Sequence, residues 1–162
     1  MYRLNFNILA FLFSILVVKL AVAADFQKGL DAALNRDFLT ANEEWTPLAE
    51  RGDATPQFQL GWLYEEGLGV SKDYKTAIKW YKRAAEQGYA YAQSALGRMY
   101  EKGKGVPQDY SRAYLWFNIA SLLWDPDAKT GQERVTKKMN LDQIEYAKKL
   151  SIKCIQKNYK NC

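Results

Sequence analysis

The chain has 162 residues, of which 48% are hydrophobic, 25% are charged and 14% are aromatic. With only 4 prolines and 10 glycines, this composition excludes a collagen-like or low-complexity chain and argues against intrinsic disorder. Histidine is absent, which excludes imidazole acid–base catalysis, Ser–His and Cys–His nucleophile pairs, and nearly all zinc and haem sites. Two cysteines are too few for an all-thiolate zinc site. We therefore expect no metal and no cofactor.

Positive charge is concentrated at the C-terminal end of the chain. The net formal charge is +5, but residues 25–128 carry 12 basic and 15 acidic side chains, whereas residues 129–162 carry 9 basic and 3 acidic ones. A nucleic-acid-binding protein needs basic residues clustered across its main surface. Because the body of this chain is mildly acidic, we expect no nucleic-acid partner.

Residues 1–24 have the pattern of a signal peptide. Arg3 supplies a positive charge, residues 8–18 form an apolar run, and Ala23 and Ala24 provide the small residues at which signal peptidase cuts. The apolar run is shorter than the roughly 20 residues that span a bilayer. We expect cleavage near Ala23 or Ala24 and a periplasmic or secreted protein. An uncleaved membrane anchor is the alternative.

A repeat of 36 residues follows the signal sequence. Shifting the sequence by this period superposes Leu60-Gly61 on Leu96-Gly97, Asp73-Tyr74 on Asp109-Tyr110, and Trp80 on Trp116. Weaker matches extend the pattern upstream. We predict a shortened, degenerate unit at residues 25–53 and full units at residues 54–89 and 90–126.

Each full unit has the pattern of two helices. Apolar residues recur at helical spacing around Gly61, and a Gly-x-Gly segment then ends the first helix, because glycine tolerates the left-handed conformation of a C-cap. Asp73 and Asp109 stand where an N-cap would begin the second helix. Glycine within a helix is unfavourable by about 1 kcal/mol, so Gly61 and Gly97 predict a close approach by a neighbouring helix. No segment alternates apolar and polar residues as a strand does, and we expect no sheet.

This pattern resembles the Sel-one-like repeat (SLR), a subfamily of tetratricopeptide-like helical repeats. The residues that carry the resemblance are Leu60-Gly61-x-x-Tyr64-x-x-Gly67-x-Gly69-Val70-x-x-Asp73-Tyr74-x-x-Ala77-x-x-Trp80-Tyr81-x-x-Ala84-Ala85-x-x-Gly88. The next unit departs from the pattern at Ser121, where alanine is usual. The resemblance covers about residues 26–155. It implies an all-α solenoid of antiparallel helix pairs that binds other proteins, as an adaptor in a bacterial envelope or secretory pathway.

Residues 127–162 leave the repeat period, and we predict that they cap the stack. Asn140-Leu141-Asp142-Gln143 resembles a capping box that opens a helix. At helical spacing, this helix would bury Leu141, Ile144, Ala147, Leu150 and Ile155. Its lysines would face outward: Lys148, Lys149, Lys153 and Lys157. Together with Lys160 they allow a weak contact with an anionic lipid surface, although such a run is more often a solvated helix face.

Cys154 and Cys162 are the only cysteines, and they lie eight residues apart. In an oxidising compartment they should pair and hold the last residues against the final helix. A reactive or intermolecular thiol pair is the alternative.

The tetratricopeptide register places the first helix of each unit on the concave side of the solenoid. The candidate binding residues on that side are Phe58, Trp62, Glu65, Glu66, Tyr91, Arg98, Glu101 and Lys102. Aromatic residues and arginine are the types that anchor protein interfaces. The alternative is that these aromatics pack against the degenerate unit or the tail.

Enzymatic sites lack support in the sequence. No serine is followed by lysine at the third position, so the Ser-x-x-Lys nucleophile of β-lactam-binding enzymes is missing. The Gly-x-Gly segments have no Gly-Lys-Ser/Thr and no preceding strand, so they do not predict a phosphate site. We predict a non-catalytic interaction adaptor. The alternative is an envelope protein that binds or hydrolyses a ligand related to peptidoglycan fragments or β-lactams.

Overall fold

The computed structural model describes residues 26–123 and 125–162. The predicted signal peptide lies outside the described residues, so export and cleavage remain predictions. Within the described part, no helix is both long enough and apolar enough to cross a membrane.

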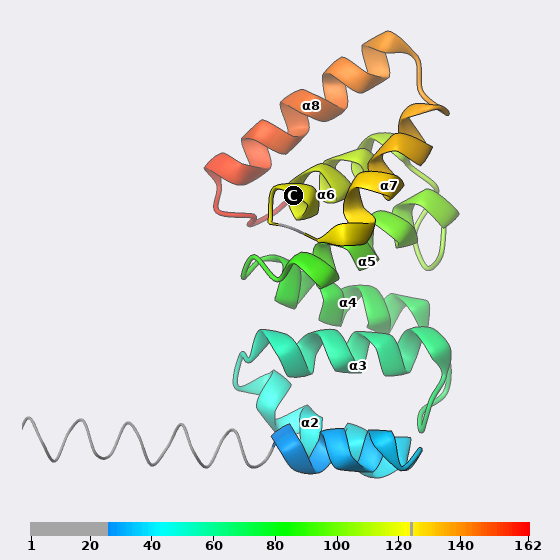
Figure 1. Cartoon of the computed structure of the whole chain (residues 1–162), viewed down its shortest axis with the longest axis vertical. Helices are drawn as coiled ribbons and strands as arrows, with labels where there is room; N and C mark the ends of the chain where they lie inside the picture. The colour runs from blue at the N-terminus through cyan, green and yellow to red at the C-terminus, as the bar shows by residue number, and fades with distance from the viewer. Residues whose placement is uncertain (1–25, 124) are drawn as a thin grey trace, which may run out of the picture.

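The described residues form helices and contain no strand. The first helix covers residues 26–34. It is followed by α2 (Phe38–Glu50), α3 (Ala54–Glu66), α4 (Tyr74–Ala85), α5 (Ala90–Lys102), α6 (Tyr110–Leu122), α7 (Pro126–Thr136) and α8 (Leu141–Gln156). Figure 1 shows these helices stacked along the longest axis of the molecule, with α2 at one end and α8 at the other. The predicted all-α solenoid is confirmed.

Helix ends fall where the repeat places its special residues. The carboxylates of Asp73 and Asp109 accept hydrogen bonds from backbone N–H groups in the first turns of α4 and α6. Gly67 and Gly103 end α3 and α5 in the left-handed conformation, at φ 73° and 65°. Both kinds of cap confirm the sequence prediction, since they depend only on residues within one helix turn.

The two helical glycines that the repeat pattern singled out, Gly61 and Gly97, mark close contacts, as predicted. A Cβ atom on Gly61 would lie 2.5 Å from the ring of buried Tyr81, and one on Gly97 would lie 2.8 Å from the ring of buried Phe117. The absence of a side chain therefore allows α3 to pack directly on α4, and α5 on α6.

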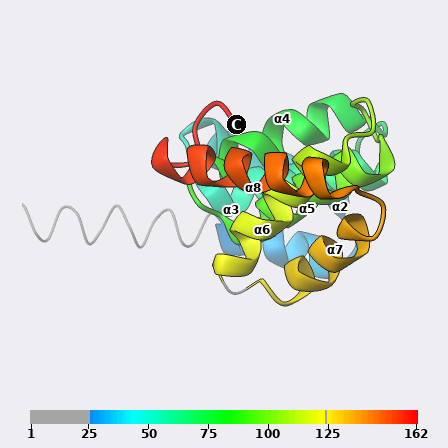
Figure 2. The same ribbon diagram turned by 90° about the horizontal axis from the view of Figure 1, so that it is seen from above.

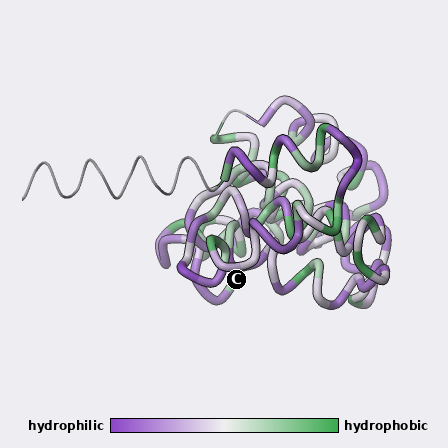
Figure 3. The backbone as a smooth tube through the Cα atoms, turned by 90° about the horizontal axis from the view of Figure 1, so that it is seen from below, coloured by the Kyte–Doolittle hydropathy of each residue, from purple (hydrophilic) through white to green (hydrophobic). Residues whose placement is uncertain are grey.

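The hydrophobic core runs through the length of the stack. Between α2 and α3 it contains fully buried Trp45 and Leu63, and farther along it contains Met99 and Trp116. Figure 3 shows hydrophobic segments mostly in the interior of the molecule and hydrophilic ones mostly at its periphery. The core thus consists of buried clusters distributed along the stack, as expected when each repeat packs on its neighbours.

The C-terminal helices pack differently from the prediction. Helices α7 and α8 both contact α6, and α8 crosses over α6 when viewed from above (Figure 2). Ala147, Ser151 and Cys154 form the buried face of α8, whereas Leu141 is 84% exposed and Ile155 is also exposed. The expected burial of Leu141 and Ile155 is therefore wrong. Small residues allow α8 to approach α6 closely, and no further helix of the described chain covers its outer side.

The predicted disulfide is present, and no cysteine in the described residues is free. Cys154 and Cys162 are joined, with their Cα atoms 5.4 Å apart. This bond turns the chain end back over the middle of the stack. Tyr159 reaches Gly88 at the end of α4, and the backbone N–H of Asn161 donates to the Glu86 carboxylate at 3.5 Å. The tail thus contacts a unit that lies far from it in sequence.

Candidate functional site

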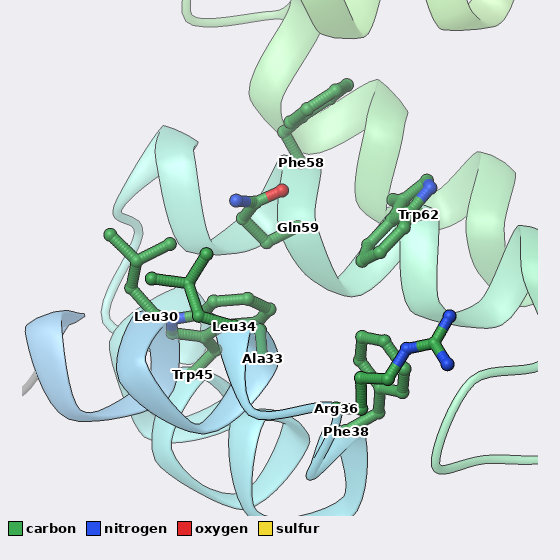
Figure 4. Close-up of a pocket in the computed structure, with 9 residues that line it drawn as sticks. All are labelled: Leu30, Ala33, Leu34, Arg36, Phe38, Trp45, Phe58, Gln59 and Trp62. Atoms are coloured by element: carbon green, nitrogen blue, oxygen red, sulfur yellow. The ribbon is translucent and has the colours of Figure 1, made fainter.

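Two of the predicted binding residues, Phe58 and Trp62, line a pocket near the N-terminal end of the stack. We call it the N-terminal pocket. It lies between the helix at residues 26–34, α2 and α3, and has a volume of about 520 Å³. Its lining residues are Leu30, Ala33, Leu34, Arg36, Phe38, Trp45, Phe58, Gln59 and Trp62, shown in Figure 4.

The walls of the N-terminal pocket are mostly apolar. Trp62 packs edge-on against Phe38, with ring centroids 5.9 Å apart. The indole N–H of buried Trp45 donates to the carbonyl oxygen of Phe26, so this polar group is already satisfied. Leu34 is 74% exposed at the rim. Among the described residues, no helix covers the pocket, which therefore offers apolar surface to water.

The remaining polar groups of this pocket are the Arg36 guanidinium and the Gln59 amide. Arg36 lies in the turn before α2 at φ 64°, a left-handed conformation that is uncommon for arginine. No hydrogen bond or ion pair joins its side chain to another described residue. Figure 4 shows Arg36 on the same side of the pocket as Trp62. An unpaired cation therefore borders an apolar surface.

An aromatic cluster adjoins the pocket through Phe58. The Phe58 ring lies 5.4 Å from that of Tyr89 and 6.2 Å from that of Tyr91, measured between centroids. Tyr91 is 53% exposed, whereas Phe58 is partly buried and also contacts Tyr81. These aromatics thus pack against one another within and between the two full units, and Tyr91 still presents surface to solvent, so their role as partner anchors stays a prediction.

Glu65, predicted to face a partner, is instead a structural residue. It is only 8% exposed, and its carboxylate accepts hydrogen bonds from the Tyr81 hydroxyl at 2.9 Å and from Nζ of Lys104 at 3.1 Å. Burial, together with the charge and hydrogen bond of Glu65, raises the pKa of Tyr81 far above its usual range. Burial opposes the charge on Lys104, but the hydrogen bond and charge of Glu65 outweigh this and raise the pKa of Lys104.

Glu101, one repeat period after Glu65, has a similar structural role. Its two carboxylate oxygens accept hydrogen bonds from Nε and a terminal nitrogen of Arg134, at 2.5 and 2.7 Å. This hydrogen bond raises the pKa of Arg134. Each glutamate therefore joins the end of one helix to a cation from the following part of the chain. Neither carboxylate is free for a partner, and the expected exposed position is wrong for Glu65.

The other predicted residues lie at the surface of α3 and α5. Glu66 and Lys102 are exposed and Arg98 is partly buried. No side-chain hydrogen bond or ion pair links any of the three to another residue in the described ranges. The predicted residues that keep surface accessible to solvent are therefore Phe58, Trp62, Glu66, Tyr91, Arg98 and Lys102.

The sequence prediction missed the half of the pocket that comes from the degenerate unit. Leu30, Leu34 and Arg36 line it, but the repeat is too weak there to assign them to a face. The apolar spacing within residues 26–34 could have pointed to Leu30 and Leu34, but it does not extend to Arg36. Within the described part of the chain, no group of three Cys, Asp or Glu side chains is placed to hold a metal ion.

Comparison with known proteins connects this architecture to a family. The model of the Sel1 repeat matches the chain at residues 57–89 and 90–123, the segments that form α3 with α4 and α5 with α6. A solved Sel1 repeat protein from Oxalobacter formigenes is 36% identical, with a TM-score of 0.62, over 70% of this chain and 88% of that protein. A search of curated proteins gives no match.

A second solved structure extends the likeness to most of the chain. It is a protective antigen present in uropathogenic Escherichia coli strains that displays an SLR fold. The two are 30% identical with a TM-score of 0.80, over 85% of this chain and 31% of that protein. This chain therefore spans about a third of the antigen's length. The matching repeats, the stacked helix pairs and the identity to a relative along most of its length show that the chain belongs to the Sel1 repeat family.

Proposed function

We propose that this protein is a non-catalytic adaptor of the bacterial envelope that docks another protein on the N-terminal pocket and the adjoining aromatic cluster. Sel1 repeat proteins generally mediate protein–protein interaction. The observation that carries the proposal is the apolar N-terminal pocket, with exposed Leu34 and unpaired Arg36 at its rim. Interfaces are built from such aromatic and arginine anchors.

The chemistry of the surface indicates how a partner would bind. A large apolar side chain would fill the space lined by Leu30, Leu34 and Trp62, and an acidic group beside it would pair with Arg36. Tyr91 and Arg98 would extend the contact along α5. Burying one large apolar side chain contributes about 1.5–3 kcal/mol, so the pocket would supply much of the affinity and the arginines its selectivity.

The test is partner capture with matched leucine variants. Wild-type protein, Leu34→Ser and Leu122→Ser are each cross-linked in envelope extract, and bound proteins are quantified by mass spectrometry. Both leucines are exposed, by 74% and 61%, so neither change should unfold the protein, and only Leu34 lines the pocket. We expect one or more partners to be lost with Leu34→Ser and retained with Leu122→Ser.

Further variants separate the pocket from the rest of the surface. Trp62→Ala should reduce capture of the same partner because it removes an aromatic anchor. Arg98→Glu should also reduce it, because it reverses a charge on the same surface. Equal recovery of every partner by wild type and all variants would reject the proposed surface.

A small envelope ligand is the second candidate function. Its motivation is the pocket volume of about 520 Å³, which lies in the usual range for small-molecule sites. Thermal stabilisation by peptidoglycan fragments or β-lactams, lost in Trp62→Ala, would favour this function. No shift with either class would leave the adaptor as the better proposal.

A further inference from the structure

The outer face of α8 exposes large apolar side chains at the end of the stack. Leu141, Tyr146, Ile152 and Ile155 are all exposed. Leu141, Ile152 and Ile155 lie at positions i, i+11 and i+14 and therefore share one stripe of the helix. In Figure 1 this helix lies at the end of the stack opposite α2. The buried face of α8 consists of Ala147, Ser151 and Cys154, so these four exposed side chains have no role in the core.

A second exposed stripe of the same helix is basic. Lys149, Lys153 and Lys157 follow Tyr146 at helical spacing, and Lys148 lies within the apolar stripe. Residues 141–162 contain five lysines and two acidic residues. One ion pair involves this group, Lys149 with Glu145, whereas no ion pair forms at Lys148, Lys153, Lys157 or Lys160 in the described chain. The positive charge is therefore available to an external anion.

The disulfide keeps the last lysine beside this helix. Because Cys162 is bonded to Cys154 in the final turns of α8, Lys160 cannot move far from Lys153 and Lys157. Tyr159 is fixed against Gly88, which further limits the tail. The cations and the apolar stripe thus form one preorganised surface.

We propose that α8 and its disulfide-closed tail bind peripherally to an anionic phospholipid bilayer. Exposed apolar side chains beside a row of lysines are the features of helices that lie in the membrane interface. The lysines would contact lipid phosphates, and Leu141 and Ile152 would enter the acyl boundary. Charge complementarity favours an anionic bilayer, because no ion pair in the described chain neutralises four of the five lysines. This surface is separate from the N-terminal pocket, so the two proposals fail independently.

Vesicle co-sedimentation tests the proposal directly. The protein is purified after expression of the full chain, and its mass is recorded so that all variants are compared with the same N-terminus. The probes are vesicles of phosphatidylglycerol with phosphatidylethanolamine and vesicles of phosphatidylcholine alone. We expect binding to the anionic vesicles, weaker binding at 0.5 M salt because charge is screened, and little binding to the neutral ones.

Matched lysine pairs provide the control. Lys153→Gln with Lys157→Gln neutralises two exposed lysines spaced i, i+4 on α8, and Lys75→Gln with Lys79→Gln does the same on α4. Each lysine near an anionic surface strengthens binding about fivefold. The α8 pair should therefore lower the partition coefficient about 25-fold, whereas the α4 pair should leave it unchanged.

The apolar contribution has its own variant. Ile152→Ser should weaken binding by about threefold or more, and this effect should persist at high salt, because it depends on buried apolar area. Circular dichroism and thermal unfolding confirm that each variant is folded. Equal binding by both lysine pairs, equal binding to neutral vesicles, or binding of α8 to an acidic protein with no vesicle binding would each overturn the proposal.

Discussion

Glycines of similar backbone conformation have different roles in this protein. Gly103 and Gly105 both have positive φ, 65° and 69°. A Cβ on Gly103 would make only ordinary contacts, the nearest at 3.4 Å, whereas one on Gly105 would lie 2.8 Å from the carbonyl carbon of Tyr74 in the preceding unit. Gly103 therefore serves its own helix end, and Gly105 allows two units to meet.

This difference predicts unequal effects of alanine at the two positions. Gly103→Ala should lower the free energy of unfolding by about 1 kcal/mol, the cost of a left-handed alanine. Gly105→Ala should lower it by about 3 kcal/mol, because the methyl group also collides with backbone that cannot move aside. Urea unfolding followed by circular dichroism measures both. Similar losses in the two variants would contradict an inter-unit role for Gly105.

Adjacent glutamates provide a second comparison at the residue scale. Glu65→Ala removes the acceptor of the buried Tyr81 hydroxyl and the partner of Lys104, and should lower the free energy of unfolding by about 1–3 kcal/mol. Glu66→Ala changes an exposed residue and should stay within about 0.5 kcal/mol of wild type. Chemical denaturation distinguishes them, and a large loss with Glu66→Ala alone would reverse the assignment.

At the scale of elements, α8 depends on its disulfide as well as on packing. Its buried face consists of small residues, so it gains less apolar burial from α6 than the larger side chains of α5 do. The bond from Cys154 to Cys162 encloses a short loop and adds contacts from Tyr159 to the end of α4. The C-terminal element is thus held both by α6 and by a unit two helix pairs away.

Replacing both Cys154 and Cys162 with serine should therefore loosen this element first. We expect the free energy of unfolding to fall by about 2–3 kcal/mol, the effect of a loop of this length. Amide hydrogen exchange should rise at the C-terminal end of α8 and at residues 86–88, and remain slow in α3. Uniform loss of protection across all helices would show that the bond stabilises the whole fold instead.

At the scale of the whole molecule, the absence of histidine shapes the response to pH. Hydrogen bonds from the Thr40 and Thr76 side chains lower the pKa of Asp37 and Asp73 below 3.8. Stability from these caps is present above the unfolded pKa and is lost as pH falls through the folded one. The pKa values of Tyr81, Lys104 and Arg134 are raised, so their stabilisation is lost only as pH rises above about 10.

We therefore expect the melting temperature to be nearly constant between about pH 5 and pH 9 and to fall below about pH 4. Differential scanning calorimetry in buffers of constant ionic strength measures this profile. Asp73→Asn should flatten the acid limb, since it removes one of the groups whose protonation is unfavourable in the folded state. A stability change with a midpoint between pH 6 and pH 8 would contradict this account, because none of these aspartate, tyrosine, lysine or arginine side chains changes its charge in that range.

Features that depend on nearby residues could be predicted from the sequence. The repeat period, the caps at Asp73 and Asp109, and the glycines beneath Tyr81 and Phe117 all recur within one helix hairpin, so the pattern itself carries them. The pairing of Cys154 with Cys162 was predictable because the two residues are close in sequence. In each case the spacing of residues that are close in sequence was enough to predict the contact.

Only the tertiary structure decided which surface residues are free. Glu65 and Glu66 look alike in sequence, but Lys104 from the next unit reaches one of them alone, and a repeat pattern does not specify such cross-unit partners. Likewise, Leu141 has the spacing of a core residue, yet its exposure depends on α6 accepting the small face of α8. The N-terminal pocket exists because the helix at residues 26–34 and α3 come together across α2. Sequence thus fixes contacts within a hairpin, whereas burial between hairpins depends on how successive units stack.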